Sequence, residues 1–378
     1  MSFFKRISAF VLIFALFTSF SSIFAAANDV VINNISANSA CLMEAESGKV
    51  LYSKNGSKRM PMASTTKVMT AIIALESGIS LNSLIKVPKG AVGVEGSSVY
   101  LREGESVTFE MLLYALMLSS ANDAAVAIAL TVSHSVEDFV VLMNAKARDL
   151  GLVDTHFTNP HGLYDEEHYT TAENLAKLMA YAMKNQDFAK ITSCKSKTFA
   201  RDGGTYFSLS NHNRLLKTYD GVIGGKTGFT KKSGRCLVTC AERDGLRLIA
   251  VTLNAPNDWN DHTKLYDFGF ASYERVYFNA QTIKIPVISG TKNEILVSSE
   301  AFSILLPKEH NEISIRINAP SFLFARIKQG ERVGKIIYSL NGKIIATSPL
   351  YSNEEVATLK YKFNLFQWLR ELFKGILN

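Results

Sequence analysis

A serine and a lysine stand three residues apart at the start of an apolar segment, as Ser64 and Lys67. In a helix, side chains at this spacing lie on one face within hydrogen-bonding reach. A serine hydroxyl needs a base to become a nucleophile, and a lysine amine can serve when burial or a nearby cation lowers its pKa. A helix start also offers backbone N–H groups for a developing oxyanion. The pair alone is a weak signal, because a capping serine beside a solvated lysine has the same spacing.

Polar residues interrupt a long apolar run at positions 119–123. Buried polar groups without partners cost roughly 1–3 kcal/mol each, so a polar break in such a run favours a site. The hydroxyl of Ser120 can relay a proton, and the amide of Asn122 can orient Lys67 or hold a substrate carbonyl. A short loop between two helices is the alternative interpretation.

A third group, Lys226, Thr227 and Gly228, follows two glycines where a strand-like region begins. Glycine lets a substrate backbone lie along an edge strand, and the lysine and threonine side chains can bind a carboxylate. A basic turn is the alternative. A phosphate-binding loop fits poorly, because the first glycine of that motif would fall at Asp220 and no helix follows.

In this order and at these separations, the three groups resemble the motif trio of penicillin-binding proteins and class A β-lactamases. The sequences at 62–70, 159–163 and 225–230 are similar to the D-alanyl-D-alanine carboxypeptidases among the low-molecular-mass penicillin-binding proteins. The resemblance covers essentially the whole chain, and residues 258–262 resemble the members associated with the spore cortex and sporulation. It implies an α+β (α/β sandwich) catalytic domain of the β-lactamase/transpeptidase type, a small all-β C-terminal domain and a terminal amphipathic helix.

The resemblance also implies a two-step acyl transfer that uses neither a cofactor nor a metal. Ser64 would attack the carbonyl between the two terminal D-Ala residues of a peptidoglycan stem peptide, with Lys67 as general base. Ser120 and Asn122 would pass a proton to the leaving D-Ala, and water would then release the acyl-enzyme. Removal of the D-Ala would limit cross-linking of the cell wall. β-Lactam antibiotics, which mimic this terminus, would acylate the same serine covalently.

Three residues would, by the same resemblance, hold the free carboxylate of the substrate: Lys226, Thr227 and Gly228. Many members of the family add an arginine near positions 255–258, but this chain has Ala-Pro-Asn-Asp there. We expect the missing positive charge to come from His212 or Arg214.

Three rival functions share parts of the pattern. A class A β-lactamase activates its deacylating water with a glutamate, but no glutamate at 166–173 stands in the Glu-x-x-x-Asn pattern of those enzymes. A metallopeptidase could use the histidines at 156–168, yet no His-Glu-x-x-His is present and their spacing fits no common helical face. A cell-wall-binding protein without activity is the third rival, and the three intact motifs argue against it.

The hydrophobic pattern predicts the elements that position these residues. Two strands are expected within 37–55 and further strands at 235–241 and 246–254, while helices are expected at 62–75, 108–132, 135–150, 171–185 and 263–272. Helices in the middle with strands at both ends predict that the terminal segments share one sheet. From about Tyr277 short alternating strands take over, at 282–287, 294–298, 302–306, 312–318, 322–328, 335–340 and 343–347. Asn341 and Gly342 predict a hairpin between the last two.

Both ends of the chain carry patterns typical of membranes. Residues 1–27 have a basic start, a short apolar run and three alanines at the end, which is the layout of a cleaved secretory signal; a membrane anchor is the alternative. Residues 359–378 repeat apolar side chains at helical spacing, which predicts a helix on a membrane surface or, alternatively, one docked on the protein's own core. We expect a catalytic domain at 28–276 and a β-rich domain at 277–358 between these ends.

Composition limits the classes of protein that remain. A hydrophobic content of 47% with 20% charged residues excludes a disordered chain, and four cysteines in 378 residues exclude a disulfide scaffold. The formal charge of +7 divides into +2 for residues 1–27, +2 for 277–358 and +3 for 359–378, so 28–276 is neutral. A neutral catalytic domain has no electrostatic footprint for nucleic acid. The basic excess fits export and peripheral attachment to an anionic membrane, on the outer face of the cytoplasmic membrane or in the cell wall.

Overall fold

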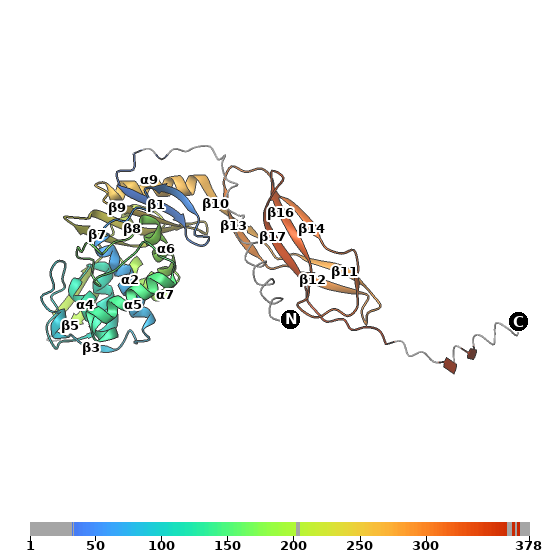
Figure 1. Cartoon of the computed structure of the whole chain (residues 1–378), viewed down its shortest axis with the longest axis horizontal. Coiled ribbons are helices and arrows are strands. Elements are labelled where there is room, and N and C mark those ends of the chain that lie inside the picture. Colours follow the sequence, from blue (N-terminus) through green and yellow to red (C-terminus); the bar gives the residue numbers. More distant parts are fainter. Residues whose placement is uncertain (1–31, 33, 202–204, 361–364, 367–368, 371–378) are drawn as a thin grey trace, which may run out of the picture. The chain divides into compact units, whose positions relative to one another are not determined.

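The computed structural model describes residues 32, 34–201, 205–360, 365–366 and 369–370. The chain divides after Glu274 into two compact units, which are described separately (Figure 1). The predicted signal segment and most of the predicted terminal helix lie outside the described residues.

A five-stranded antiparallel sheet forms the centre of unit 1, in the order β2-β1-β9-β8-β7. Its strands are β1 (Ser39–Glu44), β2 (Val50–Lys54), β7 (Val222–Thr230), β8 (Gly234–Arg243) and β9 (Leu246–Leu253). Because β1 pairs with β9, with Cys41 opposite Val251, the two ends of the unit share one sheet as predicted. Strand β7 lies at the edge, so one side of its backbone is open to a ligand.

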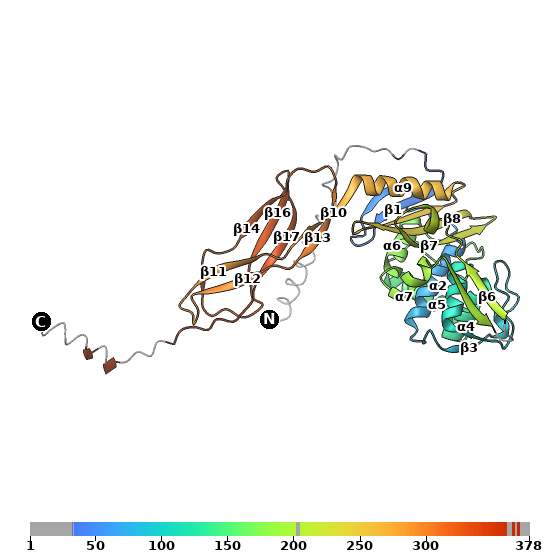
Figure 2. The same ribbon diagram turned by 180° about the vertical axis from the view of Figure 1, so that it is seen from behind.

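Helices cover both faces of this sheet. Helix α9 (Asp258–Ser272) lies on one face, and α6 (Ala172–Ala182) lies on the other (Figures 1 and 2). The α6 side continues into a helical cluster made of α2 (Lys67–Glu76), α3 (Phe109–Leu118), α4 (Asn122–Ser133), α5 (Val136–Asp149) and α7 (Gln186–Ser193). The smaller elements of unit 1 are η1 (Ala63–Thr66), η2 (Lys89–Ala91), α8 (Leu215–Thr218) and the strand pairs β3 (Leu84–Lys86) with β4 (Ser106–Thr108) and β5 (Ser196–Arg201) with β6 (Thr205–Ser210).

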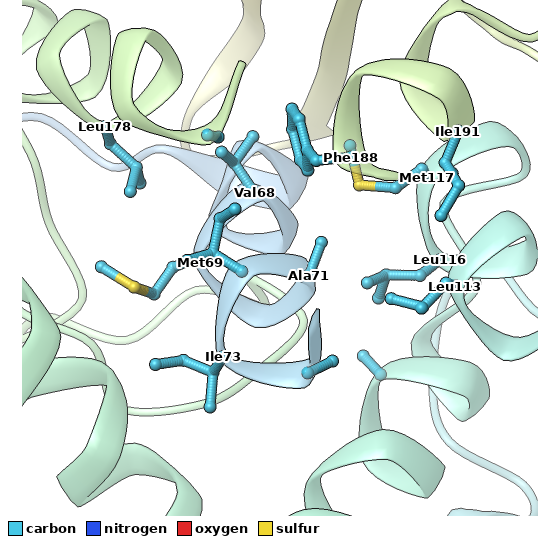
Figure 3. Close-up of a cluster of buried hydrophobic side chains, with 14 of the residues drawn as sticks. Val68, Met69, Ala71, Ile73, Leu113, Leu116, Met117, Leu178, Phe188 and Ile191 are labelled. Carbon is cyan, nitrogen blue, oxygen red and sulfur yellow. The ribbon is translucent and has the colours of Figure 1, made fainter. Parts of the chain in front are cut away.

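Helix α2 is buried on all sides over its first eight residues. Val68, Met69, Ala71 and Ile73 of this helix point in several directions into the apolar cluster (Figure 3). The neighbours come from α3, α6 and α7: Leu113, Leu116, Met117, Leu178, Phe188 and Ile191. A helix that is apolar all round belongs in the centre of a domain, so the start of α2 is held in place by packing.

Two predicted helices differ from the observed ones. The continuous helix expected at 108–132 is two helices, because the backbone leaves the helical region at Ser120, with φ at +58°, and Ala121 is extended. The helix expected at 263–272 begins five residues earlier, at Asp258. The first difference means that residues 119–121 form a break between α3 and α4. The second places residues 258–262 in a helix.

Between residues 275 and 358, the regular elements of unit 2 are all strands, as predicted. Its six-stranded sheet has the order β14-β16-β17-β12-β11-β15, and β10 pairs with β13. The bounds are β10 (Tyr273–Phe278), β11 (Thr282–Ile288), β12 (Glu294–Ser298), β13 (Phe302–Pro307), β14 (Ser314–Asn318), β15 (Leu323–Phe324), β16 (Arg332–Leu340) and β17 (Lys343–Ser352). The Asn341–Gly342 hairpin is confirmed, with positive φ at both residues. The strand expected at 322–328 is shorter, because only Leu323 and Phe324 pair with β11.

Two further findings concern membranes and cysteines. No single helix among the described residues is long and apolar enough to cross a membrane, although α4 and α5, bent by 86°, pass together on length and composition. Three of the four cysteines are buried and all four are free thiols.

Candidate active site

Ser64 lies in the single turn η1 immediately before α2. The preceding residue, Ala63, has φ at +48°, a conformation that costs an L-residue energy and is found mostly where the surrounding structure enforces it. The strained turn leaves Ser64 partly exposed while Lys67, the first residue of α2, is fully buried. The Ser64 hydroxyl is therefore accessible from the solvent, while the Lys67 amine three residues later is buried.

The Lys67 amine is surrounded by three oxygen atoms. Its Nζ lies 2.9 Å from Ser64 Oγ, 2.7 Å from Asn122 Oδ1 and 2.6 Å from the carbonyl oxygen of His161. The Asn122 Oδ1 and His161 carbonyl can only accept hydrogen bonds. A neutral amine has two N–H groups, so donating both to these acceptors directs its lone pair at the Ser64 hydroxyl.

Burial favours that neutral form. The pKa of Lys67 is lowered well below its ordinary 10.5, first because burial desolvates the ammonium and second because the Lys226 charge is nearby; the Asp123 carboxylate opposes this shift. A lowered pKa favours the neutral amine, which is the form that can act as general base for a serine nucleophile.

Strand β7 brings a second buried lysine to the same place. Nζ of Lys226 donates to Ser120 Oγ at 3.0 Å and to the Thr227 carbonyl at 2.8 Å. Burial lowers the pKa of Lys226 to about 7. Gly228 packs on the nucleophile turn, because a Cβ there would lie 3.0 Å from Ser64 N. The structure therefore gathers the residues of all three predicted groups in one location.

The helix break holds a loop beside the site. Asn122 N donates to the Ser97 carbonyl at 2.7 Å and Asn122 Nδ2 donates to the Glu95 carbonyl at 2.5 Å. The carboxylate of Asp123, which is buried, accepts from Ser98 Oγ at 2.6 Å and from a backbone N–H of the loop at 3.0 Å. Asn122 thus orients both Lys67 and the loop, and its Nδ2 bond fixes which way the amide faces.

A second loop, residues 159–163, presses directly on the nucleophile turn. Gly162 has φ at +91°, and a Cβ there would lie 2.0 Å from the Ala63 carbonyl oxygen, so only glycine fits. The neighbouring His161 carbonyl binds Lys67, and the Pro160 carbonyl accepts from Thr70 Oγ1 at 2.6 Å. The loop supplies one of the two acceptors that orient the amine.

These elements enclose a cleft of about 370 Å³. The lining residues are Ser64, Ser97, Ser120, His212, Thr227, Gly228, Phe229, Arg235, Asp258 and Trp259. The pKa of His212 is lowered by burial and by Lys226. Of the two residues expected to supply a cation, His212 lines the cleft, while Arg214 lies with its guanidinium 5.6 Å from the Trp259 ring.

Arg235 was not anticipated from the sequence. It lies on β8 opposite Phe229, forms a salt bridge with Asp258 at 3.0 Å, and its guanidinium is 5.6 Å from the Trp259 ring. Its side chain is 42% exposed whereas that of Asp258 is 3% exposed, so the carboxylate anchors an arginine that still reaches the cleft. The only sequence signal for Arg235 was its positive charge at the start of β8, the strand that pairs with the strand of Lys226.

The residues of the rival functions lie elsewhere or are already bonded. Each histidine considered as a metal ligand uses Nδ1 within the fold: His168 accepts from a backbone N–H at 3.0 Å, His161 from another at 3.2 Å, and His156 meets a backbone carbonyl at 2.6 Å. No group of three or more His, Cys, Asp or Glu side chains in the described part of the chain could hold a metal ion. Glu166 and Glu167 line a separate surface cleft.

A partly exposed serine beside a buried lysine, with a second buried lysine on an edge strand, is the arrangement expected of a serine acyl-transfer site of the Ser-x-x-Lys type, here on an α+β fold. The chain belongs to the D-alanyl-D-alanine carboxypeptidase family, whose model matches residues 24–257. Residues 272–358 match the C-terminal domain of penicillin-binding protein 5.

Relatives and solved structures agree with this assignment. The chain is 36% identical over 333 residues to the D-alanyl-D-alanine carboxypeptidase DacF of Bacillus subtilis (strain 168). The aligned region covers 85% of this chain and 86% of that protein. It is 34% identical over 370 residues to DacC of Escherichia coli (strain K12), covering 92% and 90%. The structure of penicillin binding protein 5 from Haemophilus influenzae superposes with a TM-score of 0.72 at 30% identity, covering 86% of this chain and 98% of that one. The expected family and fold class are confirmed.

Proposed function

We propose that this protein is a serine-type D-Ala-D-Ala carboxypeptidase that removes the terminal D-Ala of peptidoglycan stem pentapeptides through an acyl-enzyme on Ser64. The observation that carries the proposal is the buried Lys67 Nζ, which lies 2.9 Å from Ser64 Oγ and within hydrogen-bonding distance of two further acceptors. Metal and cofactor play no part in the steps below, which use side chains of unit 1 only.

Acylation begins when the Ser64 hydroxyl transfers its proton to Lys67 Nζ as Oγ bonds to the peptide carbonyl carbon. The carbonyl oxygen becomes an oxyanion, which the backbone N–H of Ser64 and the open edge of β7 can stabilise. The C–N bond then breaks. Ser120 gives its proton to the departing D-Ala amine and regains one from Lys67, while Lys226 donates to Ser120 Oγ throughout. Water, activated by the same lysine, hydrolyses the ester and restores Ser64.

The carboxylate of the substrate binds at the other end of the cleft. Lys226 and the Thr227 hydroxyl supply two contacts on β7, and we assign the further cation to Arg235 in place of Arg214 or His212. Asp258 holds the guanidinium at the cleft wall, with Trp259 beside it. A requirement for a free carboxylate explains why such a site cuts only at the C-terminus of a peptide.

β-Lactam antibiotics fit the same arrangement, because they also present a carboxylate next to a reactive carbonyl. Their ring opening on Ser64 leaves a bulky acyl group and no departing amine, so water reaches the ester slowly. The β-lactamase alternative is not favoured: Glu166 and Glu167 lie outside the Ser64 cleft, and Glu173 accepts from Ser53 at 2.9 Å.

The decisive experiment incubates the protein with a D-Ala-D-Ala pentapeptide and follows the products by mass spectrometry. Loss of one D-Ala, its block by penicillin, and a penicillin adduct absent from Ser64→Ala are expected. Retained activity in Ser64→Ala, or product formation abolished by EDTA, would overturn the proposal.

We further propose that the protein is exported and held at the outer face of the cytoplasmic membrane. Residues 1–27 would act as the signal, 28–276 as the catalytic domain, 277–358 as the β-rich domain and 359–378 as an amphipathic surface helix. A role in sporulation rests on residues 258–262 alone. Three of these have structural roles, since Asp258 binds Arg235, Asp261 accepts from Ser36 Oγ at 2.7 Å, and His262 lies between two buried threonines.

A further inference from the structure

Four exposed apolar side chains gather at one end of unit 2. Ile288, Phe322, Phe324 and Leu359 are between 42% and 65% exposed, and we call them the end patch. They come from three segments of the chain, so the grouping is a product of the fold. Contiguous apolar surface on a soluble domain usually marks an interaction site.

Backbone hydrogen bonds hold these segments together. Ile288 pairs with Phe324 across the parallel strands β11 and β15, and Ala325 N donates to the Ile288 carbonyl at 3.0 Å. Leu359 N donates at 2.9 Å to the carbonyl of Ser289, the residue that follows Ile288. The patch is therefore a fixed surface.

The two phenylalanines point outward because of strand alternation. Leu323 between them packs against the core of unit 2, so Phe322 and Phe324 face the opposite way. Their rings meet edge to face with centroids 5.4 Å apart. Exposed basic side chains at Arg326, Lys328 and Lys360 border the patch in sequence.

We propose that the end patch inserts into the headgroup layer of an anionic bilayer, as a membrane contact of unit 2 itself. The course of the chain supports this occupant: Leu359 belongs to the patch, Lys360 follows it, and the amphipathic sequence 361–378 continues directly from them. Aromatic and aliphatic groups with exposed lysine and arginine next to them in the sequence match the chemistry of that layer. The inference rests on the proposed membrane attachment and extends it from the tail to the folded domain.

The test is a two-by-two design in the full-length mature chain. Phe322→Ser/Phe324→Ser disrupts the patch, and Leu365→Glu/Leu369→Glu/Leu372→Glu disrupts the apolar stripe of the tail. Ile315→Ser/Ile317→Ser, at similarly exposed positions on β14 (56% and 48%), is the matched control. Binding is measured by co-sedimentation with vesicles of phosphatidylglycerol and phosphatidylethanolamine.

We expect the patch variant to bind at least about tenfold more weakly than the wild type, with the β14 variant unchanged. The tail variant should keep some binding to the vesicles, and adding the patch substitutions to the tail variant should abolish that residual binding. Equal binding of patch variant and wild type would overturn the proposal. Stronger binding of the patch variant would also overturn it, because the patch would then be covering the tail.

A second readout places an indole in the patch by Phe324→Trp, in a chain that also carries Trp368→Phe. Brominated lipids in the vesicles should quench its emission, and the same indole placed by Ile317→Trp should not be quenched. Hydrolysis of a soluble pentapeptide must stay at the wild-type rate in every variant. Loss of vesicle binding with full hydrolysis separates failure of the attachment from failure of the enzymatic proposal.

Discussion

Two buried lysine side chains lie beside one cleft, and their surroundings suit the different tasks proposed for them. Lys67 has its charge disfavoured by desolvation and by Lys226, and its two acceptors suit a neutral amine. Lys226 has a pKa near 7, so an arriving carboxylate can hold it in the charged form. In the proposed mechanism, a base and an anion-binding group coexist because the substrate carboxylate binds beside Lys226 and not beside Lys67.

The first prediction concerns Lys226 and pH. Its pKa is about 7 in the folded protein and near 10.5 in an unfolded chain, so above pH 7 the unfolded state binds more protons. The free energy of unfolding should therefore rise with pH between about 7 and 9, and this lysine contributes at most about 1.4 kcal/mol per pH unit. Lys226→Met should flatten the rise by that amount in urea denaturation at several pH values. Parallel curves for variant and wild type would contradict the burial argument.

The second prediction concerns Arg235. Arg235→Leu should lower kcat/KM for a D-Ala-D-Ala peptide about tenfold to a hundredfold, the worth of one charged hydrogen bond. The same peptide with an amidated C-terminus should be cleaved slowly by the wild type and be no worse a substrate for the variant. A merely structural arginine would lower both rates equally.

Controls for Arg235 come from its neighbours. Arg214→Leu, near the same Trp259 ring, should leave both substrates unaffected. Because Arg235→Leu leaves the buried Asp258 carboxylate without its partner, Arg235→Leu/Asp258→Asn is measured alongside to separate substrate binding from lost stability.

The sequence predicted the residues whose chemistry is carried by type and spacing. Ser64 and Lys67 are local, and Ser120 and Asn122 stand out because they are polar in an apolar run. Arg235 could not be found this way, because its proposed task depends on Asp258. That residue lies 23 positions further on and is brought close by the packing of α9 against β8. Arg214 was closer to a motif in sequence, but it is not among the residues that line the cleft.

At the level of elements, the sequence also could not predict where a helix is interrupted or which loops come into close contact. Apolar periodicity correctly predicts helical residues on both sides of Ser120, but periodicity cannot show that φ becomes positive there and turns one helix into two. Likewise, the sequence at 159–163 signals family resemblance, while its physical task, the contact of Gly162 with Ala63, appears only in three dimensions.

The third prediction tests that contact. Gly162→Ala would place a methyl 2.0 Å from the Ala63 carbonyl oxygen at a φ of +91°, so the loop must move and withdraw the His161 carbonyl from Lys67. We expect a loss of roughly 2–4 kcal/mol in unfolding free energy and at least about a hundredfold slower acylation by penicillin.

Gly78→Ala is the matched control for this loop. Gly78 has φ at +79° with nothing within 4 Å of an added Cβ, so the substitution adds the backbone cost, roughly 1 kcal/mol, without the collision. Acylation at the wild-type rate in Gly78→Ala and also in Gly162→Ala would show that the loop does not orient the lysine.

At the scale of the whole molecule, chemistry and charge are separated along the chain. Every residue that lines the Ser64 cleft lies between positions 64 and 259, in unit 1, where the sequence is close to neutral. Unit 2 has its own core of nine buried residues, including Ile285, Val297 and Ile336. The basic excess lies in unit 2 and the chain termini, which suits attachment to an anionic surface.

The fourth prediction follows from this separation. A chain ending at Glu274 should hydrolyse a soluble pentapeptide with kcat/KM within about twofold of the full-length enzyme, because the catalytic groups and their packing are retained. The same chain should lose binding to anionic vesicles and should cleave pentapeptides in membrane-bound lipid-linked precursors more slowly. Equal losses on the soluble and the membrane-bound substrate would show that unit 2 supports the catalytic fold itself. A loss confined to the membrane-bound substrate would mean that unit 2 and the tail act by raising the local concentration of enzyme where that substrate lies.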